Sequence, residues 1–383
     1  MNEGQRDEKI SSFLSERIAA GDFPSAVYMV AAGASPLLAG ALGQAVRSEA
    51  HQYPATLETI YDLASLTKPL VTGLLCALSI ESGELSLDEA IARRLPEFER
   101  EDKRSITLKH LLTHTSGLPA WRPLYITTNG EPERALQAIA GEPLESAPGT
   151  HVRYSDLGFI TLGFLLERMM NAPLKEIARR EIFEPLQLTR TFLIPEQAIQ
   201  TEAAACEIGN SYERQMCEET KAGSFSNWRE HLIWGEVHDG NAHFLGGAAG
   251  HAGLFSTARE TLRISTQFLP RHTELLKDET CALFRTNMTH GLEEARSLAW
   301  QLAATTDSTA GPHLSPDSFG HLGFTGTSCW IDPARERIFI LLTNRTHARA
   351  LPFVNINSVR RQFHALAVQS LDERETAKGR ETL

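Results

Sequence analysis

The residues with the clearest chemical potential form the stretch Ser65-Leu66-Thr67-Lys68. A serine and a lysine three residues apart lie on the same face of a helix, so the lysine nitrogen can reach the serine hydroxyl. A free hydroxyl is a weak nucleophile at neutral pH and needs such help. Because Pro69 is tolerated only in a first helical turn, we place Ser65 at a helix N-terminus, where free N–H groups favour a developing negative charge. The motif alone also fits an ordinary solvated helix start, so it needs support elsewhere in the chain.

Two other stretches also place polar residues beside or on a predicted helix or strand. Tyr154-Ser155-Asp156 comes after a predicted loop over 142–150 and precedes an apolar helix predicted over 157–170. Gly320 to Gly326, with the sequence Gly-His-Leu-Gly-Phe-Thr-Gly, lies on a late predicted strand. A tyrosine has an ordinary pKa near ~10 and serves as a base only if a nearby cation lowers it, for which Lys68 is the natural candidate. Without Ser65 we would interpret Tyr154 as a buried, hydrogen-bonded tyrosine.

Metal-binding patterns are weak throughout the chain. His110 and His114 are four residues apart, but no glutamate follows His110 as a metalloprotease helix requires. The glycine-rich stretch over 238–253 contains three irregularly spaced histidines and matches no phosphate-binding fingerprint, which favours a tight loop beside a cleft. We therefore predict neither a metal nor a cofactor. The cysteines are odd in number and lack metal-type spacing, which is typical of reduced thiols: Cys76, Cys206, Cys217, Cys281 and Cys329.

Composition places the chain among globular proteins and narrows its partners. It has 383 residues, 42% of them hydrophobic and 22% charged, with a formal net charge of −11. No cluster of lysine or arginine offsets that charge, so we expect no binding to nucleic acid or to an anionic membrane. The first twenty residues show no secretory pattern, and the apolar run over 70–80 is too short to span a bilayer. These features predict a cytoplasmic protein, and they leave its oligomeric state open.

The elements that must position these residues fall into three regions. An amphipathic helix over 8–20 and strands over 25–31 and 37–42 begin the chain, and a third strand leads into Ser65. Helical patterns dominate from 66 to about 240, with no prediction made for 195–235. Strands return over 297–304, 321–326, 328–331 and 337–343, followed by a helix near 355–370 and a polar end expected to fray. This order predicts an α/β domain formed by residues 1–65 and 245–383, with a mainly helical insertion over 66–244.

Together, the three polar stretches resemble the class C β-lactamase and penicillin-binding-protein-like serine hydrolase family, which includes esterases and D-amino-acid peptidases. The order and spacing of Ser65-Leu66-Thr67-Lys68, Tyr154-Ser155-Asp156 and His321-Leu322-Gly323 match its motifs. The resemblance extends over roughly residues 10 to 350, including 111–119, 148–150 and 250–257. It implies an antiparallel β-sheet flanked by helices, an α+β arrangement with the inserted helical subdomain.

The resemblance also assigns roles residue by residue. Ser65 would be the acylated nucleophile, Lys68 would hold or accept its proton, and Tyr154 would complete the base system and protonate the leaving group. The backbone N–H groups of Ser65 and Phe324 would form the oxyanion hole. Asp156, His321 and Gly323 would border the substrate.

The chain departs from the family's β-lactamases at three positions in these motifs. Asp156 stands where they carry asparagine, and His321-Leu322-Gly323 stands where they carry Lys-Thr-Gly, whose lysine and threonine help to seat the substrate carboxylate. A second register, Phe324-Thr325-Gly326, restores the threonine but places phenylalanine at the basic position. Either way we expect weak binding of anionic acyl substrates, which favours an esterase or amidase acting on small neutral molecules.

Two further interpretations stay open. One is a β-lactamase or a D-Ala-D-Ala-type peptidase, and the other is a non-catalytic penicillin-binding-like module. The non-catalytic module would be expected to lack Ser65, Lys68 or Tyr154, and all three are present. A Gly-x-Ser-x-Gly elbow is absent from the sequence, which disfavours the α/β-hydrolase fold.

Overall fold

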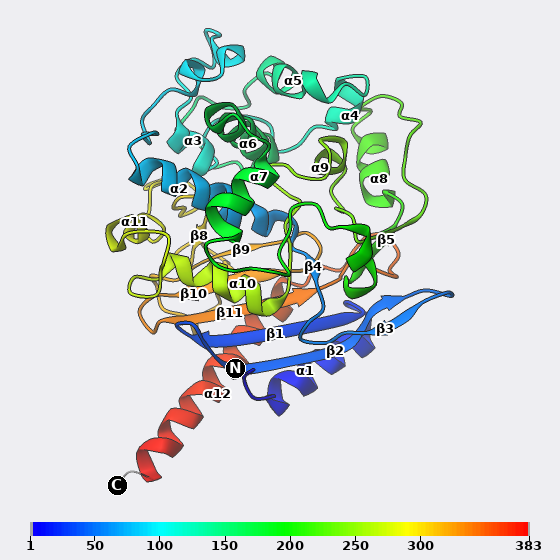
Figure 1. The fold of residues 1–383 in the computed structure, drawn as a ribbon, viewed down its shortest axis with the longest axis vertical. Coiled ribbons are helices and arrows are strands. Elements are labelled where there is room, and N and C mark those ends of the chain that lie inside the picture. Colours follow the sequence, from blue (N-terminus) through cyan, green and yellow to red (C-terminus); the bar gives the residue numbers. More distant parts are fainter. Residues whose placement is uncertain (1–2, 382–383) are drawn as a thin grey trace.

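A seven-stranded antiparallel sheet forms the centre of the protein (Figure 1). The computed structural model describes residues 3–381. The strand order is β3-β2-β1-β11-β10-β9-β8, so both ends of the chain contribute, as the sequence predicts. The strands are β1 (Ser25–Ala32), β2 (Ser35–Arg47), β3 (Gln52–Pro54), β8 (Gln301–Leu302), β9 (Phe319–Leu322), β10 (Ser328–Asp332) and β11 (Arg337–Thr343).

The N- and C-terminal parts meet where β1 pairs with β11. Their register runs from Ala26 opposite Thr343 to Ala32 opposite Arg337. Both strands are apolar along most of their length and are buried almost throughout, which is typical of a strand covered on both faces. The pairing therefore joins segments from opposite ends of the chain into one sheet.

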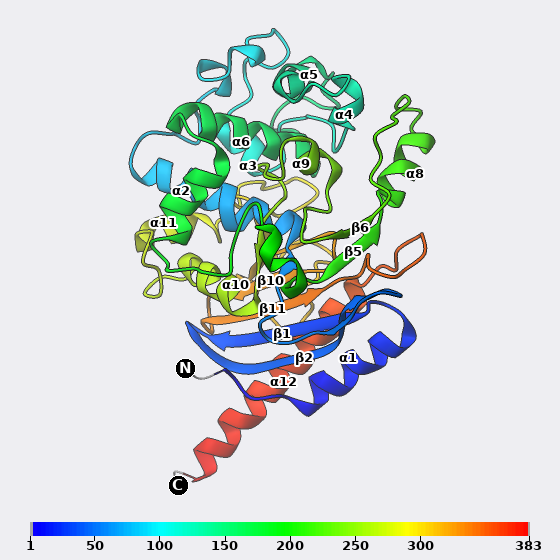
Figure 2. The same ribbon diagram turned by 45° about the vertical axis from the view of Figure 1, so that its right-hand side comes forward.

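Helices cover both faces of the sheet (Figures 1 and 2). On one face, α1 (Glu8–Ala20) and α12 (Asn357–Glu381) pack against Tyr28 and Trp330. The Asp7 side chain caps α1 by accepting a hydrogen bond from the Ile10 N–H. On the other face, α10 (Ala258–Ser265) lies against β1 and β11, and the larger helical part of the chain lies beyond it.

That helical part carries three of the predicted site residues, Lys68, Tyr154 and Asp156. Its longest helix is α6 (Asp156–Met170), whose N-cap Ser155 accepts a hydrogen bond from the Gly158 N–H. The other helices on this side are α2 (Leu74–Glu81), α3 (Leu108–Leu112), α4 (Leu124–Thr127), α5 (Ala135–Gly141), α7 (Leu174–Ala178), α8 (Ser211–Glu219), α9 (Gly240–Phe244) and α11 (Asp278–Leu283). Four short strands accompany them: β4 (Tyr61–Asp62) pairs with β7 (Phe255–Ser256), and β5 (Ala205–Ile208) pairs with β6 (Leu232–Trp234).

This architecture confirms the predicted α/β fold class with an antiparallel sheet flanked by helices. The domain boundaries at 65/66 and 244/245 stay a prediction. Among the residues described, no helix combines the length and the apolar character needed to cross a membrane.

Some elements differ from their predicted lengths. Only Gln301–Leu302 of the predicted strand over 297–304 pairs as a strand. α12 continues to Glu381, through residues predicted to fray. It extends past the sheet as one uninterrupted helix (Figure 1). The segment over 195–235, left without a prediction, contains β5, α8 and β6.

Candidate active site

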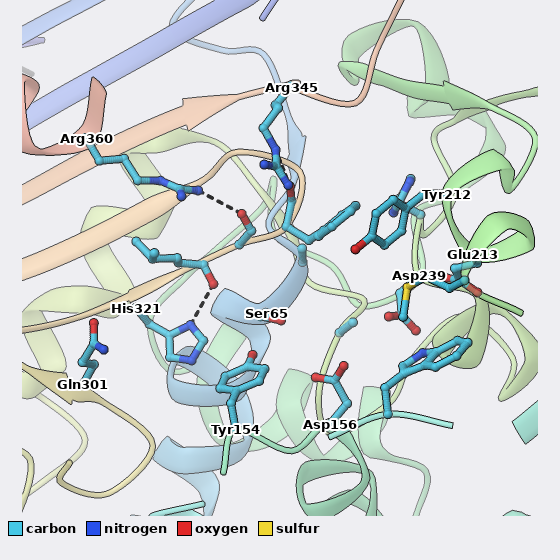
Figure 3. A pocket seen from close by; sticks show the side chains of 18 of the residues that line it. Ser65, Tyr154, Asp156, Tyr212, Glu213, Asp239, Gln301, His321, Arg345 and Arg360 are labelled. Atoms are coloured by element: carbon cyan, nitrogen blue, oxygen red, sulfur yellow. Dashed lines mark hydrogen bonds between the residues drawn. The ribbon is translucent and has the colours of Figure 1, made fainter. Parts of the chain in front are cut away.

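The nucleophile candidate lies on a short turn between β4 and a helix. Ser65 belongs to a 3₁₀ turn over Ala64–Leu66, and a π-helical turn over Lys68–Gly73 leads into α2. Pro69 is in the first turn, as predicted. Ser65 is half-buried and lines a cavity of about 420 Å³ (Figure 3). The local sequence thus places the hydroxyl at a cavity wall.

Lys68 lies beneath Ser65 and is fully buried. Its Nζ donates to Ser65 Oγ at 2.9 Å and to the His251 carbonyl oxygen at 3.1 Å. The same Nζ is 2.8 Å from Asp156 Oδ1. Burial by itself lowers the pKa of Lys68, but the charge of Asp156 and the neighbouring Tyr154 outweigh it and raise that pKa. Lys68 is therefore an ammonium ion in the free protein.

Tyr154 lies immediately before α6, beside Lys68. Its ring centroid is 4.9 Å from Lys68 Nζ, and its ring packs on that of His114 at 4.5 Å. Figure 3 shows its hydroxyl directed toward Ser65. Burial raises the pKa of Tyr154 more than Lys68 and Ser65 lower it. The predicted effect of the lysine is present but is not the larger one, so Tyr154 is a neutral phenol at rest.

The third motif ends β9 beside the turn that carries Ser65, in the same part of the cavity wall (Figure 3). His321 Nδ1 is 2.9 Å from the Leu322 carbonyl oxygen, so Nδ1 carries the proton. Burial, with the charges of Lys68 and Arg296, holds the pKa of His321 well below its ordinary value. His321 is therefore a neutral imidazole, and the first register of the motif places it in the cavity next to Tyr154, with ring centroids 5.8 Å apart.

Gly323 and Phe324 form the turn after β9. A Cβ at Gly323 would overlap Thr327 Oγ1, so only glycine allows this approach to the neighbouring strand. Within residues 3–381, the Phe324 N–H donates to no backbone or side-chain acceptor. All predicted site residues except the fully buried Lys68 reach the cavity: Ser65, Tyr154, Asp156, His321, Gly323 and Phe324.

Three arginines in the cavity wall were missed by sequence reasoning. Arg360, from α12, donates to the Gly323 and Thr327 carbonyl oxygens, and Arg345, after β11, donates to the Phe324 carbonyl oxygen at 3.0 Å. In the part of the chain that the structure describes, neither guanidinium pairs with a carboxylate, whereas Arg296 pairs with Glu294. Their sequence surroundings carry no signal for a site, because each lies in a separate element that only the fold brings to the cavity.

The far side of the cavity is acidic and aromatic, and it was also missed. Glu213 on α8 accepts hydrogen bonds from the Tyr125 hydroxyl and the Gly240 N–H. Burial and the nearby Asp239 raise the pKa of Glu213 to about 7. Asp239 accepts from the Ala242 N–H and lies 2.8 Å from His251 Nε2. Apolar side chains complete this side: Trp121, Tyr212, Met216 and Phe324.

The histidines considered as metal ligands have other partners. His110 Nδ1 accepts from the Thr107 N–H, and His114 Nδ1 accepts from the Ser155 N–H. His238 Nε2 lies 2.8 Å from Glu207 Oε1. Among the described residues, no group of three or more His, Cys, Asp or Glu side chains is placed to hold a metal ion.

Comparisons with known proteins agree with this geometry. A family model described as Beta-lactamase matches residues 10–359. A protein of Salmonella enteritidis PT4 named "Putative D-alanyl-D-alanine carboxypeptidase" is 30% identical and covers 93% of this chain and 86% of its own. A protein of Escherichia coli K12 with the same name is 32% identical over 77% of this chain and 71% of its own.

Solved structures share the fold at lower identity. EstCE1, described as a hydrolase with promiscuous acyltransferase activity, has a TM-score of 0.71 and 21% identity, covering 93% of this chain and 97% of its own. Simvastatin synthase (LovD) from Aspergillus terreus has a TM-score of 0.71 and 20% identity, covering 94% of this chain and 98% of its own. A class C beta lactamase from Rhodobacter sphaeroides has a TM-score of 0.70 and 18% identity, covering 94% of this chain and 99% of its own.

Proposed function

The chain belongs to the beta-lactamase family, and on that premise we propose that it is a hydrolase that forms an acyl-enzyme on Ser65, from esters or amides of small molecules. The observation that carries the proposal is the buried Lys68 ammonium, which donates to Ser65 Oγ at 2.9 Å in the wall of a cavity. A hydroxyl with a fixed proton-handling partner and access to ligand is what acyl transfer requires.

The resting charges suggest how the serine proton leaves. Lys68 is protonated at rest, so it must first release a proton, and Asp156 Oδ1 at 2.8 Å is the nearest acceptor. As Ser65 Oγ bonds to the substrate carbonyl carbon, its proton passes to Lys68 while Lys68 passes one to Asp156. The phenol of Tyr154 then gives its proton to the departing alkoxide or amine and regains one from the Asp156–Lys68 pair. Water hydrolyses the ester on Ser65 by the reverse path.

The oxyanion formed during attack needs donors that are free beforehand. Among the residues that the structure describes, the Phe324 N–H has no acceptor, and Phe324 lines the cavity next to Gly323. Together with the Ser65 N–H it would form the oxyanion hole. Neutral substrates fit the apolar side of the cavity, where Trp121 and Met216 offer contact area.

A second candidate is a peptidase for substrates that end in a free carboxylate. Arg345 and Arg360 favour it, because both line the cavity without a carboxylate partner among the described residues. The family's β-lactamases carry a lysine where this chain has His321, and the two arginines offer positive charge in its place. The sequence argument against anionic substrates did not take these arginines into account. The names of the curated relatives point the same way.

Labelling with a fluorophosphonate serine probe tests the proposed function without presuming a substrate. We expect one adduct by intact mass on the wild type and none on Ser65→Ala, which should also lose all turnover. The absence of an adduct on both proteins, or the same adduct on both, would contradict the proposal. Short p-nitrophenyl esters and N-acyl-D-alanyl-D-alanine, assayed side by side, then separate the two candidate substrate classes.

A further inference from the structure

We propose that Asp62 is a positioning residue that fixes the nucleophile turn relative to the turn after β9, so that the Ser65 and Phe324 N–H groups face one oxyanion. The inference rests on the proposed function and deepens it. Asp62 lies in β4, three residues before Ser65, and its side chain is buried. It does not line the cavity, so it acts through its neighbours.

Each carboxylate oxygen of Asp62 holds a different segment. Oδ1 accepts from the Ala64 N–H at 2.8 Å, directly before the nucleophile. Oδ2 accepts from the His238 N–H at 2.8 Å, in the segment that leads into α9. Burial raises the pKa of Asp62, and the hydrogen bonds from the His238 and Ala64 N–H groups oppose that rise. Because both bonds are 2.8 Å long and buried, this side chain links the two backbone segments.

The hydrogen bond between the Ala64 N–H and Asp62 lies at a residue whose backbone conformation is strained. Ala64 has φ of +47°, in the left-handed region that residues with a Cβ rarely adopt. Such a conformation persists only when the surroundings impose it. The bond from the Ala64 N–H to Asp62 Oδ1 fixes the peptide plane that precedes Ala64 and so helps to hold this turn, and the next residue in the chain is Ser65.

The backbone of the same segment holds the turn after β9. The Thr325 hydroxyl donates to the Asp62 carbonyl oxygen at 2.7 Å, and the Thr327 hydroxyl donates to the Leu63 carbonyl oxygen at 3.0 Å. The turn itself is closed by the Gly323 N–H, which donates to the Thr327 carbonyl oxygen at 2.8 Å. Thr325, directly after Phe324, is thus tied to the segment that ends at Ser65, and Gly323, directly before Phe324, is tied to Thr327, which also bonds to that segment.

The His238 contact braces the Phe324 side chain. The two rings stack at 5.6 Å with planes 24° apart, and His238 Nε2 is fixed 2.8 Å from Glu207 Oε1. The Arg345 guanidinium lies 4.9 Å from the centre of the Phe324 ring. Asp62, by holding the His238 backbone, therefore also limits movement of the residue that carries the second oxyanion donor.

Asp62→Asn tests this role, with Asp332→Asn as the matched control. Asparagine keeps the shape but presents an N–H₂ group to one of the two N–H donors. Asp332 is an equally buried aspartate on β10 that accepts from Ser315 and the Arg335 N–H, outside the site. Loss of one oxyanion donor costs roughly 10²–10³-fold in kcat, so we expect Asp62→Asn to lower kcat by roughly ten- to a thousandfold with KM changed less than about threefold.

A tetrahedral mimic separates positioning from general damage to the fold. We expect the affinity for phenylboronic acid to fall in Asp62→Asn in proportion to kcat, because the boronate oxygen occupies the oxyanion hole. Asp332→Asn should lose unfolding free energy but keep kcat and boronate affinity. A fall in kcat without a fall in boronate affinity, equal losses in both variants, or no loss in Asp62→Asn would overturn the inference.

A second variant keeps the test decisive if Asp62→Asn fails to fold. Thr325→Val removes only the hydroxyl that donates to the Asp62 carbonyl oxygen, and it should lower kcat and boronate affinity together, by less than Asp62→Asn is expected to. Unchanged kcat in folded Thr325→Val would then overturn the inference. Fluorophosphonate labelling distinguishes the failures: an unlabelled wild type ends both proposals, whereas a labelled, active wild type with unaffected variants ends only this one.

Discussion

At the scale of single residues, the charge state of the site is set by the partners of Lys68 and not by Lys68 alone. Complete burial would favour a neutral amine, yet Asp156 at 2.8 Å keeps the ammonium. Asp156 stands where the resembling β-lactamases carry a neutral asparagine. The substitution therefore raises the pKa of Lys68, the residue that we propose handles the Ser65 proton.

Asp156→Asn should consequently move the pH profile. Asp156 raises the pKa of Lys68, so its removal lowers that pKa and makes the neutral amine available at lower pH. Because the variant also lacks the proposed acceptor of the Lys68 proton, we expect kcat/KM to reach a lower plateau, with its rising limb shifted to lower pH, measured with a neutral ester from pH 5 to 10. Asp102→Asn, which removes an exposed partner of Lys103 far from the cavity, is the control. A shift of the limb to higher pH in Asp156→Asn would contradict this account.

The two proton-handling partners of Ser65 should each matter strongly. General acid–base groups contribute roughly 10²–10⁴-fold, so Lys68→Ala and Tyr154→Phe should each lower kcat/KM by about that factor. The double variant should lose less than the product of the two factors, because the residues act on one proton path. Tyr53→Phe, on the edge strand β3, should retain full activity. Activity of Tyr154→Phe within about threefold of the wild type would remove Tyr154 from the mechanism.

At the scale of elements, close backbone contacts bring the glycine-rich segment against two helical segments. Gly250 packs directly on Gly163 of α6, and its carbonyl oxygen accepts from the Thr72 hydroxyl at 2.7 Å. The next residue, His251, supplies a carbonyl oxygen to Lys68 Nζ. The predicted tight loop beside a cleft is therefore part of the lysine's binding site, and its small residues permit the approach.

Gly250→Ala should separate these elements. A Cβ at Gly250 would overlap the Phe159 carbonyl oxygen, and that atom belongs to the backbone of α6, which cannot easily move. Overpacking of this kind costs about 1–3 kcal/mol of unfolding free energy, and the shift of His251 should also lower kcat. Gly141→Ala, at the end of α5 with open space around it, is the control and should be neutral or stabilising by up to about 1 kcal/mol. Equal unfolding midpoints for the two variants in urea would refute the packing argument.

At the scale of the whole molecule, the sheet separates the site from a second buried layer. The cavity lies on one side, between β9 and the helices, while α1 and α12 cover the other side (Figure 2). α12 links the two, because Arg360 reaches the cavity and His364, one turn later, is buried among Trp330, Phe339 and Phe363. Stability of this layer is therefore coupled to the position of a cavity residue.

His364 should make unfolding depend on pH. Its Nδ1 is 2.8 Å from the Thr309 carbonyl oxygen, and burial lowers its pKa to about 4. Because the pKa of His364 is lower in the folded protein than in the unfolded chain, the unfolded chain binds a proton first as the pH falls. The contribution of His364 to the free energy of unfolding is therefore complete above pH ~6.5 and is lost as the pH falls toward ~4. We expect a loss of about 3 kcal/mol across that window from this residue.

His364→Gln should flatten that dependence. Urea unfolding at pH 4.5, 5.5, 6.5 and 8 gives the free energy at each pH, and the value at pH 8 gives the packing cost of the substitution alone. The difference between wild type and variant should shrink as pH falls. A difference that stays constant from pH 8 to 4.5 would show that His364 is not the titrating group.

The sequence by itself determined the local features of this protein. The i, i+3 spacing of Ser65 and Lys68, with Pro69 in the first turn, predicted their contact, because residues one turn apart lie on the same face of a helical segment. Period and cap signals likewise predicted α1, α6 and β11 close to their bounds. The resemblance added the order of the three motifs, and the fold class followed from it.

Only the tertiary structure decided the chemistry around that local core. The partners of Lys68, the cations Arg345 and Arg360, the acidic side with Glu213, and the hold of Asp62 on the turn after β9 all join residues far apart in the chain. No periodicity or motif records such contacts, since they arise when β1 pairs with β11 and the helical part folds back on the sheet. Charge, burial and hydrogen bonding act through space, and for that reason the protonation states of Lys68, Tyr154 and His321 could not be predicted from the sequence.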